Sequence, residues 1–79
     1  MAIKDFENFT VSELSEIIAD TILTDEDREI AKLRYIKLLP YEKIAEKLGI
    51  DKRTIYTRVR TIKYKIEKTI LFNSKEDGH

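Results

Sequence analysis

The stretch Tyr41-Glu-Lys-Ile-Ala-Glu-Lys-Leu-Gly-Ile50 decides the fold of this 79-residue chain. Apolar residues recur in it at the spacing of one helix face, which predicts a short helix over residues 41–48. Pro40 suits the start of this helix, and Gly49 can adopt the left-handed conformation that ends it. Asp51 can then cap the helix that follows. We therefore expect a helix, a tight turn and a second helix.

The segment after the turn predicts a long helix from Lys52 to about Ile70. Apolar residues stand at offsets of 4, 7, 11 and 15 from the first of them, which places all of them on one narrow face. They are Ile55, Val59, Ile62, Ile66 and Ile70. We expect this stripe to face the core, and we expect the polar residues 73–79 to form a disordered tail.

Two further helices are predicted before the turn. A capping box at Thr10 and apolar residues at helical spacing predict a first helix over about residues 11–22. Thr24 begins a second helix over about residues 25–38, with acidic side chains in its first turn and basic ones towards its end, as the helix dipole favours. The sequence thus predicts an all-α, four-helix domain over residues 1–72, with a helix-turn-helix and a long C-terminal recognition helix.

The composition restricts the function. The chain has 15 basic and 15 acidic residues, no cysteine, and one histidine, His79. We therefore expect no disulfide, no metal site and no cofactor. A domain this small has little room for an enclosed active site, so we do not expect an enzyme. No apolar run approaches the roughly 18 residues of a membrane span, so we expect no membrane contact and a cytoplasmic location.

The charge is sorted along the chain. Residues 1–40 carry a net charge of −4 and residues 41–79 a net charge of +4. Between Asp51 and Ile70, seven basic residues stand against two acidic ones. A basic helix on a neutral domain can bind an anionic polymer, but a Lys-rich helix is also an ordinary solvated surface. Charge alone leaves both interpretations open.

The predicted long helix carries hydrogen-bonding side chains on the face opposite its apolar stripe. At about 100° per residue, four of them lie between about 140° and 200° from Ile55. These four are Arg53, Thr57, Arg60 and Tyr64, and Tyr56 and Thr61 flank them. Such side chains can reach base edges in a major groove, and cations beside them can meet phosphates. The lateral cations are Lys52, Arg58, Lys63 and Lys65.

Three segments of the chain resemble region 4, the DNA-binding part of bacterial sigma-70-type factors, particularly the extracytoplasmic-function group. The stretch Leu23-Thr-Asp-Glu-Asp-Arg-Glu-Ile-Ala-Lys-Leu-Arg-Tyr35 is similar to the family's acidic helix start and apolar-Leu-Arg-Tyr ending. Residues 41–50 resemble its Tyr-Glu-Glu-Ile-Ala-Glu-x-Leu-Gly-Val pattern, and Thr54-Ile-Tyr-Thr-Arg-Val59 resembles Thr-Val-x-Ser-Arg-Leu. The resemblance runs from about Leu23 to Ile66, with the segments in the family's order and spacing.

The resemblance implies a helix-turn-helix that reads the −35 element of a promoter. The residues that it would place against the DNA bases are Lys52, Arg53, Thr54, Tyr56, Thr57 and Arg60, with Arg58 on the backbone. It also implies RNA polymerase core as a partner. The chain has no room for region 2, so we expect that a partner would have to supply promoter opening. It also departs from the family at Pro40, where a capping Ser is usual.

Alternatives remain open at the level of sequence. A homodimeric repressor or activator could pair through Phe6, Val11, Leu14 and Ile18 or through the exposed end of the last helix. Small phage regulators and the DNA-binding part of phage small terminase subunits use similar modules, so either a bacterial or a phage origin is open. A protein-binding adaptor could instead use the acidic first half of the chain to dock on RNA polymerase or on a sigma-like partner.

Overall fold

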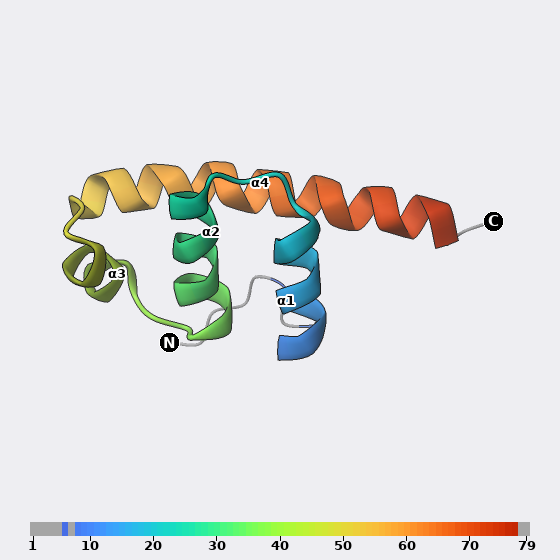
Figure 1. Ribbon diagram of the computed structural model, residues 1–79, viewed down its shortest axis with the longest axis horizontal. Coiled ribbons are helices and arrows are strands. Elements are labelled where there is room, and N and C mark those ends of the chain that lie inside the picture. The colour runs from blue at the N-terminus through green and yellow to red at the C-terminus, as the bar shows by residue number, and fades with distance from the viewer. Residues whose placement is uncertain (1–5, 7, 78–79) are drawn as a thin grey trace.

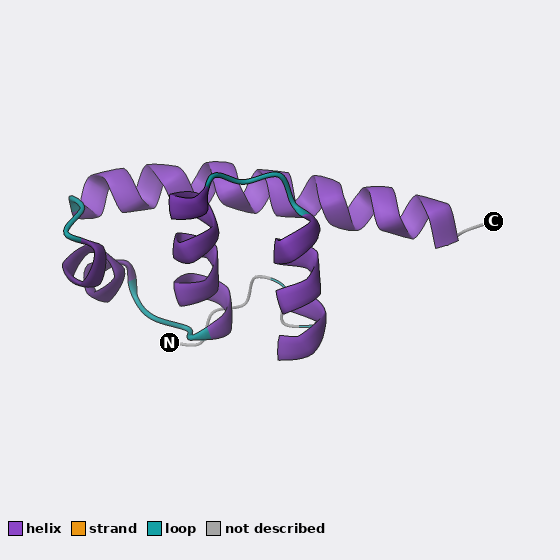
Figure 2. Cartoon of the chain, in the orientation of Figure 1, coloured by secondary structure: helices purple, strands orange, loops and turns teal. Residues whose placement is uncertain are grey.

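The computed structural model describes Phe6 and residues 8–77 (Figure 1). Its elements, in chain order, are α1 (Val11–Asp20), α2 (Asp25–Ala31), η1 (Lys32–Ile36), α3 (Tyr41–Leu48) and α4 (Lys52–Asp77). The segment η1 is a π-helical continuation of α2. The residues that the structure describes form helices, turns and loops, with no strand (Figure 2). The predicted all-α fold of four helices with a helix-turn-helix is confirmed.

Helix α4 is the element on which the other helices pack. It contacts α1, α2 and α3, which lie along one side of it, with α3 nearest its N-terminus and α1 furthest along (Figure 1). Its 26 residues span about 39 Å, and the described chain measures 44 × 25 × 17 Å. The last part of α4 therefore projects beyond the body formed by the other helices.

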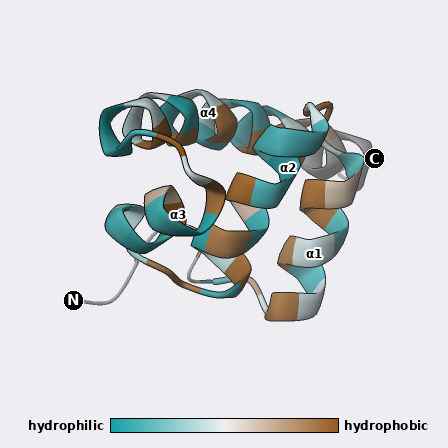
Figure 3. Cartoon of the chain, turned by 60° about the vertical axis from the view of Figure 1, so that its left-hand side comes forward, coloured by the Kyte–Doolittle hydropathy of each residue, from teal (hydrophilic) through white to brown (hydrophobic). Residues whose placement is uncertain are grey.

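The hydrophobic core lies between α4 and the three other helices. Each helix carries both hydrophobic and hydrophilic residues (Figure 3), and the hydrophobic ones supply this core. The largest fully buried side chains are Ile18, Ile30, Ile44, Ile55, Ile62 and Ile66. The predicted stripe of α4 is thus confirmed over its first four members, whereas the fifth, Ile70, is half-buried.

The first predicted helix ends earlier than expected, at Asp20 instead of about Ile22. Thr21 leaves the helix with φ −78° and ψ 137°, and its hydroxyl donates to the Ile17 carbonyl at 2.7 Å. The same hydroxyl lies 2.9 Å from that of Thr69 on α4. This long-range hydrogen bond fixes the turn and leaves Ile22 exposed to solvent.

The ends of the second and fourth helices also differ from the prediction. The second helix widens into η1 and stops at Ile36, and Leu38 takes a left-handed conformation with φ 59°. The amide of Leu39 donates to the Leu33 carbonyl at 3.0 Å, which closes this wide turn before Pro40. Helix α4 continues beyond Ile70, so residues 73–77 of the predicted disordered tail are helical. No glycine or proline interrupts α4, and 78–79 lie outside the described residues.

Arg28 of α2 closes the C-terminal end of α1. Its Nη1 donates to the carbonyls of Ile18 at 2.6 Å and Ala19 at 3.3 Å, and its Nη2 donates to the Leu23 carbonyl at 3.3 Å. The last turn of α1 carries no basic residue of its own. Arg28 therefore supplies both donors and positive charge where a helix end needs them.

We predict that Arg28→Met lowers the free energy of unfolding by about 1–3 kcal/mol, because three carbonyls, two of them in part-buried hydrogen bonds, lose a charged donor. Lys32→Met is the matched control, since Lys32 is an exposed cation for which the structure records no side-chain hydrogen bond. Urea denaturation followed by circular dichroism measures both. Equal losses in the two variants would show that Arg28 does not stabilise the junction of α1 and α2.

Candidate nucleic-acid interface

The turn between α3 and α4 has the geometry that the sequence predicts. Gly49 is left-handed, with φ 66° and ψ 33°, and the Ile50 amide donates to the Ala45 carbonyl at 3.1 Å. This bond closes the helix in the manner of a Schellman motif. Asp51 then caps α4 by accepting from the Arg53 amide at 3.0 Å. The two helices of the motif are therefore joined without a flexible linker.

The face of α4 opposite the core is open to solvent over its N-terminal half. All seven residues predicted to face bases are exposed, namely Arg53, Thr54, Tyr56, Thr57, Arg60, Thr61 and Tyr64. Four of them line one open hollow of about 310 Å³, which contains Thr57, Arg60, Thr61 and Tyr64. The structure thus brings the predicted residues together on one surface, and their contact with DNA remains a prediction.

The threonines of this face are partly engaged with their own helix. The Thr57 hydroxyl donates to the Arg53 carbonyl at 3.1 Å, and the Thr61 hydroxyl donates to the Thr57 carbonyl at 3.5 Å. In this arrangement each hydroxyl oxygen still has lone pairs that can accept a hydrogen bond from outside. The face therefore combines arginine donors with threonine acceptors.

A stack of three side chains links the start of α4 to the rest of the domain. The guanidinium carbon of Arg34 lies 4.1 Å from the centroid of the Tyr41 ring, and Arg34 Nη1 donates to the Leu39 carbonyl at 3.1 Å. The rings of Tyr41 and Tyr56 meet edge to face, with centroids 5.6 Å apart. Tyr56 is therefore held by α3 on one side while half of its surface stays exposed.

Arg58 forms an ion pair within the protein. Its Nη1 lies 2.8 Å from Asp27 Oδ1 and 2.9 Å from Glu26 Oε1, both at the start of α2. The hydrogen bond to Asp27 and the charges of both carboxylates raise the pKa of Arg58 above its ordinary value. A raised pKa means that the ion pair stabilises the fold below the ordinary arginine pKa and is lost only at still higher pH. The Arg58 side chain therefore stays positively charged at neutral pH and well above it.

The lateral lysines differ in their surroundings. Lys52 and Lys65 are exposed, whereas Lys63 is half-buried. Lys65 lines a groove between α4 and the end of α1, and Lys52 lies beside Tyr56 near the turn. Their predicted contacts with phosphates remain predictions. The side chain of Arg58, by contrast, already has two carboxylate partners, and 38% of it stays exposed for a third.

Comparison with known families assigns the chain to one of them. The family model described as "Sigma-70, region 4" matches residues 22–66, which is more than half of the chain. The chain belongs to the sigma-70 region 4 family. This region 4 domain is accordingly a DNA-binding helix-turn-helix domain of transcription regulation, and the resemblance seen in its sequence is confirmed. No curated protein and no solved structure is significantly similar to the chain.

The described part of the region 4 domain has neither a group of metal-ligating side chains nor a membrane-spanning helix. No three His, Cys, Asp or Glu residues there gather in a way that could hold a metal ion. No helix there is both long and apolar enough to cross a membrane.

Sequence reasoning missed the Arg34–Tyr41–Tyr56 stack and the pairing of Arg58 with α2. Both depend on the angles at which α2, α3 and α4 cross, which periodicity within one helix does not report. The acidic residues predicted to match the helix dipole do lie in the first turn of α2. The same carboxylates also bind a cation from another helix.

We predict that Arg58→Met and Asp27→Asn each lower the urea midpoint, and that the double variant loses less than the sum of the two. The reason is that both substitutions remove the same interaction, in which the Asp27 side chain is only 14% exposed. Lys43→Met is the control, because the pair Lys43–Glu46 is long, at 3.9 Å, and exposed on both sides. Additive losses would contradict an ion pair between α2 and α4.

Proposed function

We propose that this region 4 domain is a sequence-specific regulator of transcription that inserts the N-terminal half of α4 into the major groove of double-stranded DNA. The observation that carries the proposal is the exposure of every predicted base-facing residue on a helix whose opposite face is buried in the core. A helix held in this way can present one face to a groove about as wide as the helix itself.

The proposal gives different roles to the side chains of α4. The forked donors of Arg53 and Arg60 can bind the edge of a guanine with two hydrogen bonds, and Thr57 between them can contact a neighbouring base. Lys52, Lys63 and Lys65 would meet phosphates and set the position of the helix. Arg58 would keep its carboxylates and add a phosphate contact only through its exposed part.

Selection of bound duplexes from a random pool, at near-physiological salt, provides the ligand for the test. On the enriched duplex we predict that Arg53→Ala or Arg60→Ala costs about 1–3 kcal/mol and relaxes the preference at one position. Lys52→Ala should weaken the enriched and a scrambled duplex alike and lower the salt slope by about 1. Fluorescence anisotropy measures both quantities.

Two results would overturn the proposal that α4 reads bases. If no duplex is enriched, or if the two arginine variants lose as much affinity for the scrambled duplex as for the enriched one, α4 does not read bases. Unchanged circular dichroism spectra of the variants are the control for folding.

We propose RNA polymerase as the protein partner, bound through the exposed face of α1. Sigma-70 region 4 domains bind both DNA and RNA polymerase. Helix α1 bears the exposed carboxylates Glu13 and Glu16, which suit a basic partner surface and would repel DNA. This face lies outside the DNA-facing half of α4, so both ligands can bind together.

We predict that Glu13→Gln/Glu16→Gln weakens binding to RNA polymerase core and leaves DNA affinity unchanged, because only the α1 surface loses charge. Surface plasmon resonance with immobilised core enzyme measures the first effect, and anisotropy the second. Glu29→Gln, at an exposed carboxylate of α2, is the matched control. Equal core binding by the variant and the wild type would remove α1 from the polymerase interface.

A further inference from the structure

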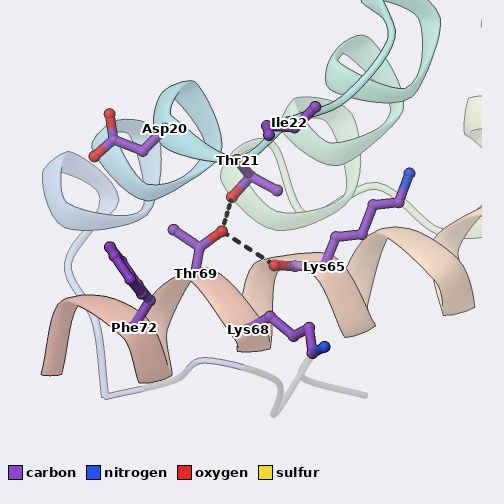
Figure 4. A pocket seen from close by; sticks show the side chains of 7 residues that line it. All are labelled: Asp20, Thr21, Ile22, Lys65, Lys68, Thr69 and Phe72. Carbon is purple, nitrogen blue, oxygen red and sulfur yellow. Dashed lines mark hydrogen bonds between the residues drawn. The ribbon is translucent and has the colours of Figure 1, made fainter. Parts of the chain in front are cut away.

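An open groove lies at the end of the molecule away from the turn, between the end of α1 and the later part of α4 (Figure 4). It has a volume of about 740 Å³. The residues that line it are Asp20, Thr21, Ile22, Lys65, Lys68, Thr69 and Phe72. Ile22 is 89% exposed and Phe72 is 62% exposed, so two large apolar side chains at this groove stand in water.

The groove is a fixed feature of the fold. Thr21 and Thr69 both line the groove, and their hydroxyls are joined by a hydrogen bond (Figure 4). The Thr69 hydroxyl also donates to the Lys65 carbonyl at 3.1 Å. Thr21 is almost fully buried. Ile22 therefore stays outside because the bond of Thr21 turns the chain, and Phe72 stays outside because α4 runs past the body of the domain.

The charges around the groove are arranged on opposite sides. In Figure 4, a line drawn from Ile22 to Phe72 has Asp20 on one side and the two lysines, Lys65 and Lys68, on the other. Asp20 belongs to α1 and the lysines belong to α4, and all three are exposed. The apolar side chains of Ile22 and Phe72 thus lie between an acidic corner, formed by Asp20, and a basic corner, formed by Lys65 and Lys68.

We propose that this groove is the interface of a symmetric homodimer, with a two-fold axis along the line from Ile22 to Phe72. Rotation about that axis places the apolar side chains of the two copies together. It also brings Asp20 of each copy to Lys65 and Lys68 of the other. A patch that carries both signs in this way is complementary to itself, as an isologous interface requires.

Charge also favours a second copy over a different occupant. A strongly acidic partner would meet the lysines but be repelled by Asp20, and a basic partner would face the reverse. The chain has a formal net charge of zero, so two copies do not repel each other at long range. The small apolar area predicts a weak dimer, below the size of a standard interface.

The dimer leaves the seven residues proposed to face bases uncovered, and of the proposed phosphate contacts it engages only Lys65. Leu71 lies on the same side of α4 as the residues proposed to face DNA. It is 67% exposed and does not line the groove. Thr57 lies fifteen residues before Phe72, or about 22 Å along α4. Two copies joined near Phe72 can therefore separate their recognition segments by up to about 45 Å, which includes the roughly 34–36 Å of one turn of DNA. This consequence, a site of two inverted halves, rests on the proposed function.

Sedimentation equilibrium of the free protein, without DNA, tests the dimer separately from DNA binding. We expect a monomer–dimer equilibrium between about 10 μM and 1 mM, and we expect Ile22→Ser or Phe72→Ala to weaken it by about tenfold or more, through loss of apolar burial. Leu71→Ala is the matched control and should dimerise like the wild type. A wild type that stays monomeric at 1 mM overturns the proposal, as does equal dimerisation of the Ile22→Ser variant.

Charge reversal provides the test of the two-fold arrangement. Asp20→Lys alone, and Lys65→Glu/Lys68→Glu alone, should each lose self-association, because like charges then meet at both corners. An equimolar mixture of these two variants should form a heterodimer, since each acidic corner again faces a basic one. A mixture that stays monomeric would contradict the proposed pairing. Circular dichroism confirms that each variant is folded.

Discussion

The burial of the isoleucine stripe of α4 is the constraint on which the rest of this structure depends. Ile55, Ile62 and Ile66 are fully buried, and each such side chain contributes about 1.5–3 kcal/mol. An exposed ion pair contributes about 0–1 kcal/mol, so the stripe and not the surface charges sets the rotation of α4 about its own axis. Once that rotation is fixed, residues half a turn away have to face solvent.

Polar and aromatic contacts between helices add to the packing of the isoleucine stripe. Tyr56 packs on α3 and Arg58 pairs with the start of α2, both within the first two turns of α4, and Thr69 joins the later part of α4 to the end of α1. Each contact acts at a different point along one helix. Helix α4 is therefore held in register with all three neighbours, and it presents its exposed side as a stable surface, which direct reading of DNA bases requires.

Much of the fold could be predicted from sequence because its signals are local. The cap at Asp51, the left-handed Gly49 and the period of the α4 stripe each depend on neighbours in the chain. The missed features depend on contacts between segments far apart. Thr21 ends α1 early through a partner 48 residues away, and Arg58 finds its carboxylates 31 residues away. Residue types predicted the candidate site, but only the packing of the helices showed that all seven residues predicted to face bases are exposed, whereas Arg58 and Lys63 are half-buried.

We propose that the exposed face of α4 binds DNA while the rest of the domain supports it. Titration of the isotope-labelled protein with duplex DNA, followed by amide chemical shifts in NMR spectra, tests this claim most directly. We expect the largest shifts from Asp51 to Tyr64 and small ones over α1. Largest shifts over α1, or shifts on α4 that vanish at near-physiological salt, would contradict it.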